Sequence, residues 1–203
     1  VVYDLYTGTG TIANFIAASA GKVIGIDFTE AMIERAKQNT EKLGFDNVFF
    51  RQGDIESMPV TDNVADVVVS NCVLNLVPNK HKVFSEIFRV LKPGAHFSIS
   101  DIVLEGELPE RWKQIAELYA GCVAGAIQKT DYLTIIEEAG FNNITLQKEK
   151  AIMLPDDILA EYLAAEEITA YKASKTKITS ITVFAQKPAK DSRNCCEPGN
   201  GCC

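Results

Sequence analysis

The sequence predicts an α/β fold: a mostly parallel, doubly wound sheet with an antiparallel edge strand near the C-terminus. Short apolar runs rich in β-branched residues alternate with stretches of roughly 10 to 15 residues that have helical spacing. A small-residue turn with two glycines joins the first apolar run to the first helix. The 203 residues, 47% of them hydrophobic and 23% charged, are enough for one compact domain and too few for two ordinary ones.

The first part of the chain has the pattern strand, loop, helix, strand, helix. Residues 1–5 are an apolar run, and after the glycine turn residues 11–20 are rich in helix formers. Residues 22–26 are the second predicted strand. Thr29 is placed to cap the next helix, and Gly44 is placed to end it.

The middle of the chain repeats the alternation. Residues 48–51 are strand-like, and residues 64–69 form a run rich in β-branched residues, of the kind expected for a strand buried on both faces. Asn79 is predicted to open a helix that the Lys-Pro-Gly sequence at residues 92–94 closes. Residues 97–103 are the next predicted strand.

The last third is predicted to close the sheet. A helix is expected from Pro109 to about Ala126, and Thr130 is expected to cap another that Gly140 ends. The remaining predicted elements are strands at residues 143–146 and 178–185 with a helical segment at residues 156–165 between them. These two late strands are the expected antiparallel edge of the sheet.

We predict one compact domain over residues 1–187, with a core at residues 1–150 and a C-terminal extension at residues 151–187. From residue 188 the composition changes to Lys, Pro, Ser, Asn, Gly and Cys without periodicity, so residues 188–203 are expected to be a flexible, cysteine-rich tail. The sequence begins at Val1 without a methionine and runs directly into a strand, which leads us to expect a preceding segment.

Charge and cysteine usage narrow the class of partners. Twenty basic residues against 27 acidic ones give a net charge of -7, which argues against a nucleic-acid partner. No apolar run approaches the roughly 20 residues of a spanning helix, and no signal peptide opens the chain, so we expect no membrane partner. Two of the six cysteines lie inside the patterned chain, which is typical of a reduced, cytoplasmic protein and not of a disulfide scaffold.

The predicted ligand site lies beyond the carboxyl ends of the parallel strands. Gly8 and Gly10 follow the first strand and would let the backbone approach a ligand closely. Asp27 follows the second strand and is placed to accept the hydroxyls of a ribose. Asp54 and Ile55 follow the third strand and would bind an adenine amino group and pack on its ring. The combination, with no lysine for phosphate, suits S-adenosylmethionine.

Two other interpretations of these residues remain open. A dinucleotide-binding domain shares the glycine loop and the acid after the second strand, although the loop here is D-x-x-x-G-x-G and not G-x-G-x-x-G. Alternatively, the glycines form only a tight turn, Asp27 only caps a helix and Asp54 is only a solvated loop residue.

The segments 4–10, 53–54 and 89–94, with Asp27 and Asn71, resemble the motifs of class I S-adenosylmethionine-dependent methyltransferases over residues 1 to about 150. The resemblance implies a Rossmann-like fold and S-adenosylmethionine as the cofactor. The cofactor-binding residues that it implies are Asp4, Tyr6, Thr7, Gly8, Gly10, Asp27, Phe28, Asp54, Ile55 and Asn71. That family usually has glycine where Tyr6 stands, so the tyrosine is expected to crowd the methionine end of the cofactor.

Residues 70–78 and 120–126, together with the cysteine-rich C-terminus, resemble segments of arsenite methyltransferases. The resemblance implies that Cys72 and Cys122 are the catalytic thiolates that hold trivalent arsenic, in arsenite detoxification. The chemistry is consistent with this, because trivalent arsenic is soft and prefers sulfur. Its lone pair can attack the methyl group in line, and no general base is needed because the attacking atom carries no proton.

Further sulfur atoms are expected to take part. Arsenite methyltransferases typically use a third cysteine in the N-terminal part of the fold, and none precedes Cys72, so it lies outside this chain or a small-molecule thiol replaces it. The substrate is therefore arsenite or its thiol conjugate, with a thiol reductant as co-reactant. The tail cysteines are candidates for capturing arsenite or another soft ion: Cys195, Cys196, Cys202 and Cys203.

Several functional alternatives remain. Each internal cysteine is, taken alone, typical of a small buried hydrophobe. A methyltransferase acting on a small organic metabolite would not need Cys72 or Cys122, and a non-catalytic arsenite-binding module would need both but no cofactor. Residues 4–12 also resemble the cofactor loop of RNA 5-methyluridine methyltransferases, but the acidic charge and the cysteine positions disagree. The sequence leaves the oligomeric state open.

Overall fold

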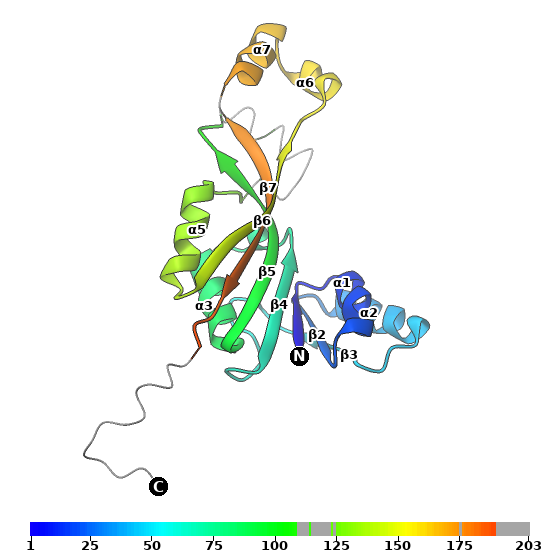
Figure 1. Cartoon of the computed structure of the whole chain (residues 1–203). Helices are drawn as coiled ribbons and strands as arrows, with labels where there is room; N and C mark the ends of the chain where they lie inside the picture. The colour runs from blue at the N-terminus through cyan, green and yellow to red at the C-terminus, as the bar shows by residue number, and fades with distance from the viewer. Residues whose placement is uncertain (109–113, 115–122, 124, 175, 190–203) are drawn as a thin grey trace, which may run out of the picture.

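The computed structural model describes residues 1–108, 114, 123, 125–174 and 176–189. Their strands form one seven-stranded sheet in the order β3-β2-β1-β4-β5-β7-β6 (Figure 1). The strands are β1 (Val2–Leu5), β2 (Val23–Asp27), β3 (Val48–Gln52), β4 (Ala65–Asn71), β5 (Leu91–Glu105), β6 (Asn142–Ile152) and β7 (Lys177–Gln186). The first five run parallel to one another, and β7 pairs antiparallel with both β5 and β6.

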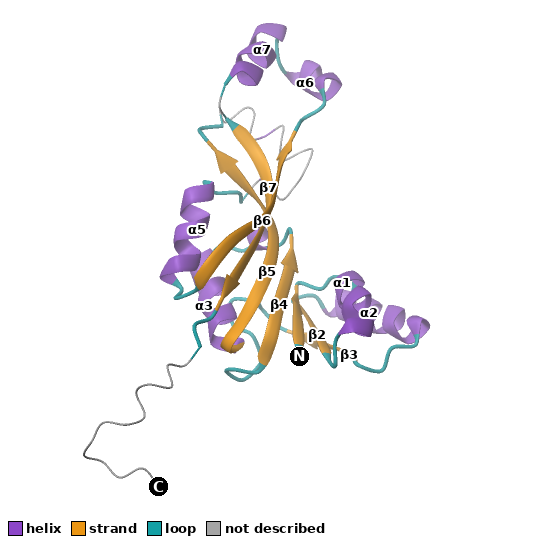
Figure 2. Cartoon of the chain, viewed as in Figure 1, coloured by secondary structure: helices purple, strands orange, loops and turns teal. Residues whose placement is uncertain are grey.

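The helices complete the alternation that the sequence predicts (Figure 2). They are α1 (Thr11–Ile16), α2 (Glu30–Leu43), α3 (Lys80–Val90), α5 (Lys129–Glu138), α6 (Asp156–Tyr162) and α7 (Ala165–Ala173), with short 3₁₀ turns η1 (Ala17–Ser19) and η2 (Leu74–Leu76). The predicted α/β class and the antiparallel pairing near the C-terminus are confirmed. The strand that runs antiparallel is β7, one position inside the edge, and β6 forms the edge itself.

Helices pack on both faces of the sheet. Val23 belongs to an apolar cluster with Ala13 and Ala17 at the α1 side, whereas its neighbour Ile24 belongs to the main core with Phe84 and Ile87 of α3. Successive side chains of a strand point to opposite faces. The two clusters therefore lie on opposite faces of the sheet, as a doubly wound fold requires.

A third apolar cluster lies near the carboxyl end of β5. It combines residues of β5 and β7 with residues of α6 and of the chain before α5, and Cys72 packs against it. The buried members are Ile102, Leu104, Val123, Ala126, Leu154, Leu159, Leu163 and Ile178. This cluster brings the C-terminal part of the chain to the same end of the sheet as the predicted ligand site.

Four local predictions need correction or lie outside the described residues. The helix after β1 is α-helical only to Ile16, where η1 continues it. The helix before β6 begins at Lys129 and not after Thr130, because Gln128 already has extended backbone angles and forms a bridge with Leu104. The predicted helix at residues 109–126 falls mostly outside the described residues, as does most of the tail.

Strand burial also differs from the prediction in β4. Val68 is fully buried, whereas Val67 and Val69, which lie on the other face, are only half-buried. The run of β-branched residues therefore predicted the strand correctly, but the two faces of the strand are not buried to the same extent. Likewise β5 begins at Leu91, so Pro93 and Gly94 lie inside the strand and do not form a loop before it.

Candidate functional site

The loop after β1 is built on Asp4. This side chain is 1% exposed, and its Oδ2 accepts hydrogen bonds from Thr7 Oγ1 (2.6 Å) and from the backbone N–H of Ala13 (3.1 Å). Burial raises the pKa of Asp4 to about 6, and the two hydrogen bonds oppose that shift. Asp4 therefore holds the loop against α1, and its carboxylate is not open to solvent.

Gly8 and Gly10 of this loop have different surroundings. Gly10 has φ +80°, and a Cβ there would lie 3.0 Å from the Phe50 ring and 3.1 Å from Asn14, so only glycine fits without displacement. Gly8 has φ +55°, but a Cβ would meet nothing within 4 Å. The backbone at Gly8 is therefore the part of the loop with open space beside it.

Asp27 connects the ends of β1 and β2. Its Oδ2 accepts the backbone N–H of Gly8 (2.9 Å) and its Oδ1 accepts that of Thr29 (2.9 Å). Thr29 is the residue before α2 as predicted, but its own side chain makes no capping hydrogen bond. Phe28, the next residue after Asp27, is 62% exposed, and its carbonyl accepts a hydrogen bond from Gln52 Nε2 (3.1 Å).

The loop after β3 places its two predicted residues differently. Asp54 is exposed, and its Oδ1 accepts the N–H of Glu56 (2.8 Å). Ile55 is fully buried in the main core, so its side chain does not face the open side of the loop where an adenine ring was expected to pack. Phe28, by contrast, exposes its aromatic ring next to the carboxyl end of β2.

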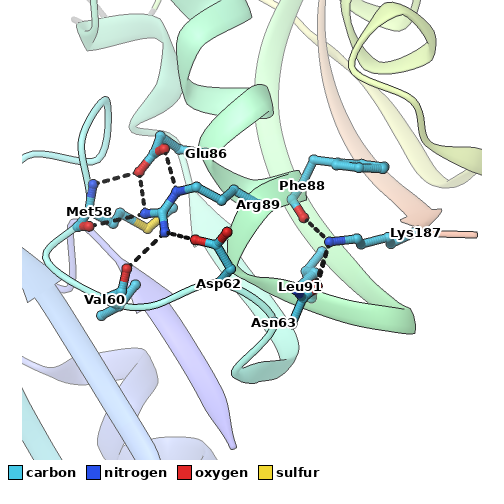
Figure 3. Close-up of polar contacts among 9 residues, drawn as sticks. All are labelled: Met58, Val60, Asp62, Asn63, Glu86, Phe88, Arg89, Leu91 and Lys187. Atoms are coloured by element: carbon cyan, nitrogen blue, oxygen red, sulfur yellow. Dashed lines mark hydrogen bonds and ion pairs between the residues drawn. The ribbon is translucent and has the colours of Figure 1, made fainter.

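The loop that carries Asp54 is held by Arg89 of α3 (Figure 3). The guanidinium donates to both carboxylate oxygens of Glu86, each at 2.7 Å, and to Asp62 Oδ1 at 2.7 Å. It also donates to the carbonyls of Val60 (2.9 Å) and Met58 (3.2 Å). The sequence marked residues 89–94 only as a motif, and the structure gives Arg89 a role in fixing the loop.

Tyr6 lies among the acidic residues of this site. Its φ of 50° is in the left-handed region, which explains why glycine suits this position better than a residue with a Cβ. Burial raises the pKa of the Tyr6 hydroxyl, and the negative charges of Asp54, Asp27 and Glu56 raise it further. The phenol therefore lies close enough to the ends of β2 and β3 to feel both carboxylates.

Cys72 stands just beyond β4, at the same end of the sheet. Its backbone N–H donates to the Ser100 carbonyl (2.8 Å), its φ is 58°, and its side chain is half-buried. The preceding residue, Asn71, is exposed. The structure thus brings Asn71 and Cys72 together with the ends of the first three strands.

A buried polar network that the sequence analysis missed lies beside Cys72. Asp101 of β5 is 1% exposed; its Oδ1 accepts the N–H of Ile102 (2.9 Å) and its Oδ2 accepts the Tyr132 hydroxyl (3.4 Å). Burial raises the pKa of Asp101 to about 6. The pKa of Tyr132 is also raised, first by burial and then by the charges of Asp101 and Cys72. The signal in the sequence was an aspartate within an apolar strand.

Cys122 and the four tail cysteines lie outside the described residues, and their roles stay predictions. Val123, the residue that follows Cys122, is 1% exposed and belongs to the cluster against which Cys72 packs. Among the residues that are placed, no group of three or more His, Cys, Asp or Glu side chains could hold a metal ion. None of the helices within the described ranges is long and apolar enough to span a bilayer.

The fold and the site together define the class. A sheet of this order, with a glycine loop after β1 and acidic residues after β2 and β3, is the arrangement of class I methyltransferases. Residues 1–140 match the family described as Methyltransferase domain, and the chain belongs to that family.

Individual relatives give more detail. An arsenite methyltransferase of Halobacterium salinarum is 36% identical over 194 residues, which cover 94% of this chain and 47% of that protein. A demethylmenaquinone methyltransferase of Lactiplantibacillus plantarum is 32% identical over 175 residues, 72% of each chain. The crystal structure of an arsenic(III) S-adenosylmethionine methyltransferase from Chlamydomonas reinhardtii has a TM-score of 0.75 at 30% identity, covering 94% of this chain and 64% of that one. The chain spans about half the length of the curated arsenite methyltransferases it matches.

Proposed function

We propose that this chain methylates trivalent arsenic with S-adenosylmethionine, holding the arsenic between the thiolates of Cys72 and Cys122. The observation that carries the proposal is the position of Cys72. It lies at the sheet end that carries Asp27 and Asp54, in contact with the apolar cluster that contains Val123. The similarity to arsenite methyltransferases, which extends over 94% of the chain, supports the choice of arsenic.

The residues at the strand ends fit the proposed cofactor. Each oxygen of Asp27 accepts one backbone N–H and has a second lone pair for a ribose hydroxyl. The exposed ring of Phe28 offers a surface for adenine, and the exposed carboxylate of Asp54 can accept its amino group. Gly8 leaves room for close approach of the ligand to the backbone. The cofactor would supply an activated methyl group on a sulfonium.

The chain's own contribution to the chemistry is to bind and orient arsenic. When a cysteine thiol replaces a hydroxide on arsenite, one As–S bond forms, one As–O bond breaks and one water leaves. Two such bonds fix the direction of the arsenic lone pair, and most of the rate enhancement is then positioning. Because methyl transfer raises arsenic to the pentavalent state, we include a thiol reductant that returns it to the trivalent state. Reduced thiols are consistent with the cytoplasmic location we propose.

Serine substitutions test this function. Cys72→Ser and Cys122→Ser are each expected to abolish arsenite methylation, because a hydroxyl is a poor ligand for soft arsenic. Cofactor affinity should stay within about twofold. The assay is mass spectrometry of products with saturating arsenite, isotope-labelled S-adenosylmethionine and a thiol. Cys202→Ser is the matched control, because the tail is expected to matter only at low arsenite concentration. Wild-type turnover in either internal variant would remove arsenic from the proposal.

One observation favours a second candidate, a methyltransferase for a small organic acceptor. The Lactiplantibacillus plantarum relative, named a demethylmenaquinone methyltransferase, aligns over 72% of both chains. In that case the Cys72 and Cys122 variants would retain methyl transfer to an organic acceptor.

A third possibility is a non-catalytic arsenite-binding module. Calorimetry distinguishes it from both methyltransferases, because such a module would bind arsenite without binding S-adenosylmethionine.

The tail cysteines are proposed to deliver arsenite to the internal pair. Deletion of residues 195–203 is then expected to lower the methylation rate only at low arsenite concentration. If the deletion also abolished folding, the tail would have a structural role, and the delivery proposal would fail.

A further inference from the structure

Lys80, the first residue of α3, is buried although it carries an ammonium group. The residue is 8% exposed, and its Nζ donates a hydrogen bond to the carbonyl of Gly125 (2.9 Å). This bond joins residues 45 positions apart in the chain. Lys80 therefore connects the start of α3 to the chain segment that precedes α5.

Gly125 also makes a close contact with η2. A Cβ at Gly125 would lie 1.8 Å from the carbonyl oxygen of Asn75 and 2.9 Å from its carbonyl carbon. The two backbones are thus in direct contact, and only glycine permits it. Asn75 is itself held on β5, because its Nδ2 donates to the Ile102 carbonyl (2.7 Å). Lys80, Asn75 and Gly125 form one unit, which we call the Lys80 clasp.

The clasp costs free energy that a neutral side chain would avoid. Burial lowers the pKa of Lys80, which reflects the cost of removing an ammonium from water, and the negative charge of Asp101 opposes that shift. A methionine would fill a similar volume without this cost. The ammonium is therefore best explained by the bond it makes to the Gly125 carbonyl.

The clasp joins two positions that each follow an internal cysteine closely in the sequence. Asn75 is three residues after Cys72, and Gly125 is three residues after Cys122. Three residues of chain reach at most about 10 Å. Any change in how Gly125 sits on Asn75 therefore changes the range of separations open to the two sulfur atoms.

We propose that Lys80 is a positioning residue that holds Gly125 on η2 so that Cys72 and Cys122 can bind one arsenic atom together. This inference rests on the proposed function for its purpose, but its physical content is the separation of two thiols. Holding two ligands at a fixed separation raises the effective concentration of the second thiol once the first has bound. Loss of the clasp should weaken two-thiol binding and leave the cofactor residues unaffected.

Crosslinking by dibromobimane measures this separation without arsenic. The reagent links two nearby thiols, each thiolate displacing one bromide, and becomes strongly fluorescent when both have reacted. The full chain is used with the four tail cysteines replaced by serine, so that only Cys72 and Cys122 react. The test variant is Lys80→Met, the conservative variant is Lys80→Arg, and the control is Lys82→Met, an exposed lysine on the same helix.

The expected result is a loss of about tenfold in crosslinking rate for Lys80→Met, the loss that one charge-assisted hydrogen bond implies. The KM for arsenite should rise by a similar factor while the KM for S-adenosylmethionine stays within twofold. Lys80→Arg should restore most of the rate, and Lys82→Met should match the parent. Gly125→Ala keeps Lys80 but forces the backbones of Gly125 and Asn75 apart, so it should lower the crosslinking rate by a similar factor. If Lys80→Met does not fold, Gly125→Ala is the deciding variant.

Two results overturn the inference. One is wild-type crosslinking in Lys80→Met, or in Gly125→Ala when Lys80→Met is unfolded. The other is the absence of crosslinking in the parent chain, because Cys72 and Cys122 would then not lie close together even with Lys80 present. A different pattern separates the proposed function from this inference: crosslinking that depends on Lys80, with arsenite methylation that survives Cys72→Ser, would retain the clasp and reject the arsenic assignment.

Discussion

Arg89→Met is expected to destabilise the protein by about 3 kcal/mol at pH 7. The variant removes the paired hydrogen bonds to Glu86, whose side chain is 17% exposed, and hydrogen bonds to charged groups contribute about 1.5–3 kcal/mol each. The contact with Asp62 adds little, because that side chain is 64% exposed. Because Arg89 and Glu86 are both partly exposed, solvent screening reduces the contribution of the pair as a whole to about 1.5–2 kcal/mol, and the lost donors to the Val60 and Met58 carbonyls, at about 0.5–1 kcal/mol each, bring the total to about 3 kcal/mol.

The loss should depend on pH with a defined sign. Hydrogen bonding to Arg89 holds the pKa of Glu86 below its ordinary value of 4.5. Since the folded-state pKa lies below the unfolded-state pKa, this stabilisation is full above about pH 4.5 and is lost as the pH falls through the folded-state pKa. The difference between wild type and Arg89→Met should therefore be constant from pH 8 to 5 and shrink at more acidic pH.

Urea unfolding followed by circular dichroism measures these free energies. Arg35→Met, at an exposed arginine of α2, is the matched control and should stay within about 0.5 kcal/mol of wild type. Because Arg89 fixes the loop that carries Asp54, its loss should also weaken S-adenosylmethionine binding. An Arg89→Met variant within 0.5 kcal/mol of wild type would show that Arg89 does not hold this loop, and a loss of stability that grows as the pH falls would contradict the ion pair with Glu86.

Three further predictions concern the loop after β1. Asp4→Asn should raise the unfolding free energy at pH 8 by about 3 kcal/mol, because the folded-state pKa of about 6 lies above the ordinary 3.8 and the folded state therefore favours a neutral side chain. The gain should fade between pH 6 and 4, where Asp4 itself becomes protonated, and urea titrations at several pH values measure it. Tyr6→Gly should tighten S-adenosylmethionine binding several-fold by calorimetry, since it relieves a φ of 50° and removes a ring beside two carboxylates; unchanged affinity would contradict the crowding expectation. Gly10→Ala should lower the unfolding free energy by about 2 kcal/mol, because φ is +80° and the new Cβ meets the Phe50 ring; a neutral thermal melt would count against this account.

The alternation of strands and helices could be predicted because each element has a local cause. Gly44 ends α2 with φ 74°, as the sequence suggested, and Asn79 caps α3 through its side chain, which accepts the N–H of Lys82. The start of α5 was predicted less well, because Gln128 forms a long-range bridge with Leu104 that no local pattern contains.

In the candidate site, too, the sequence predicted what depends on position along a strand and missed what depends on long-range contacts. The strand-end rule placed Asp27, Asp54 and Cys72 at one end of the sheet from sequence alone. It could not tell that Ile55 turns into the core, since an apolar residue in a loop suits either side. Lys80 was also beyond reach, because the carbonyl it binds lies 45 residues away and leaves no mark on the spacing of side chains.

The strand order has a consequence for biosynthesis. In the described chain β6 pairs only with β7, and β7 is inserted between it and β5. At typical translation rates of about 5–20 residues per second, β5 and β6 leave the ribosome seconds before the strand that must enter between them. During that interval both present unsatisfied backbone edges to other nascent chains. Slow translation near residue 177 would prolong this exposure, so codon choice there is expected to influence how much protein escapes aggregation.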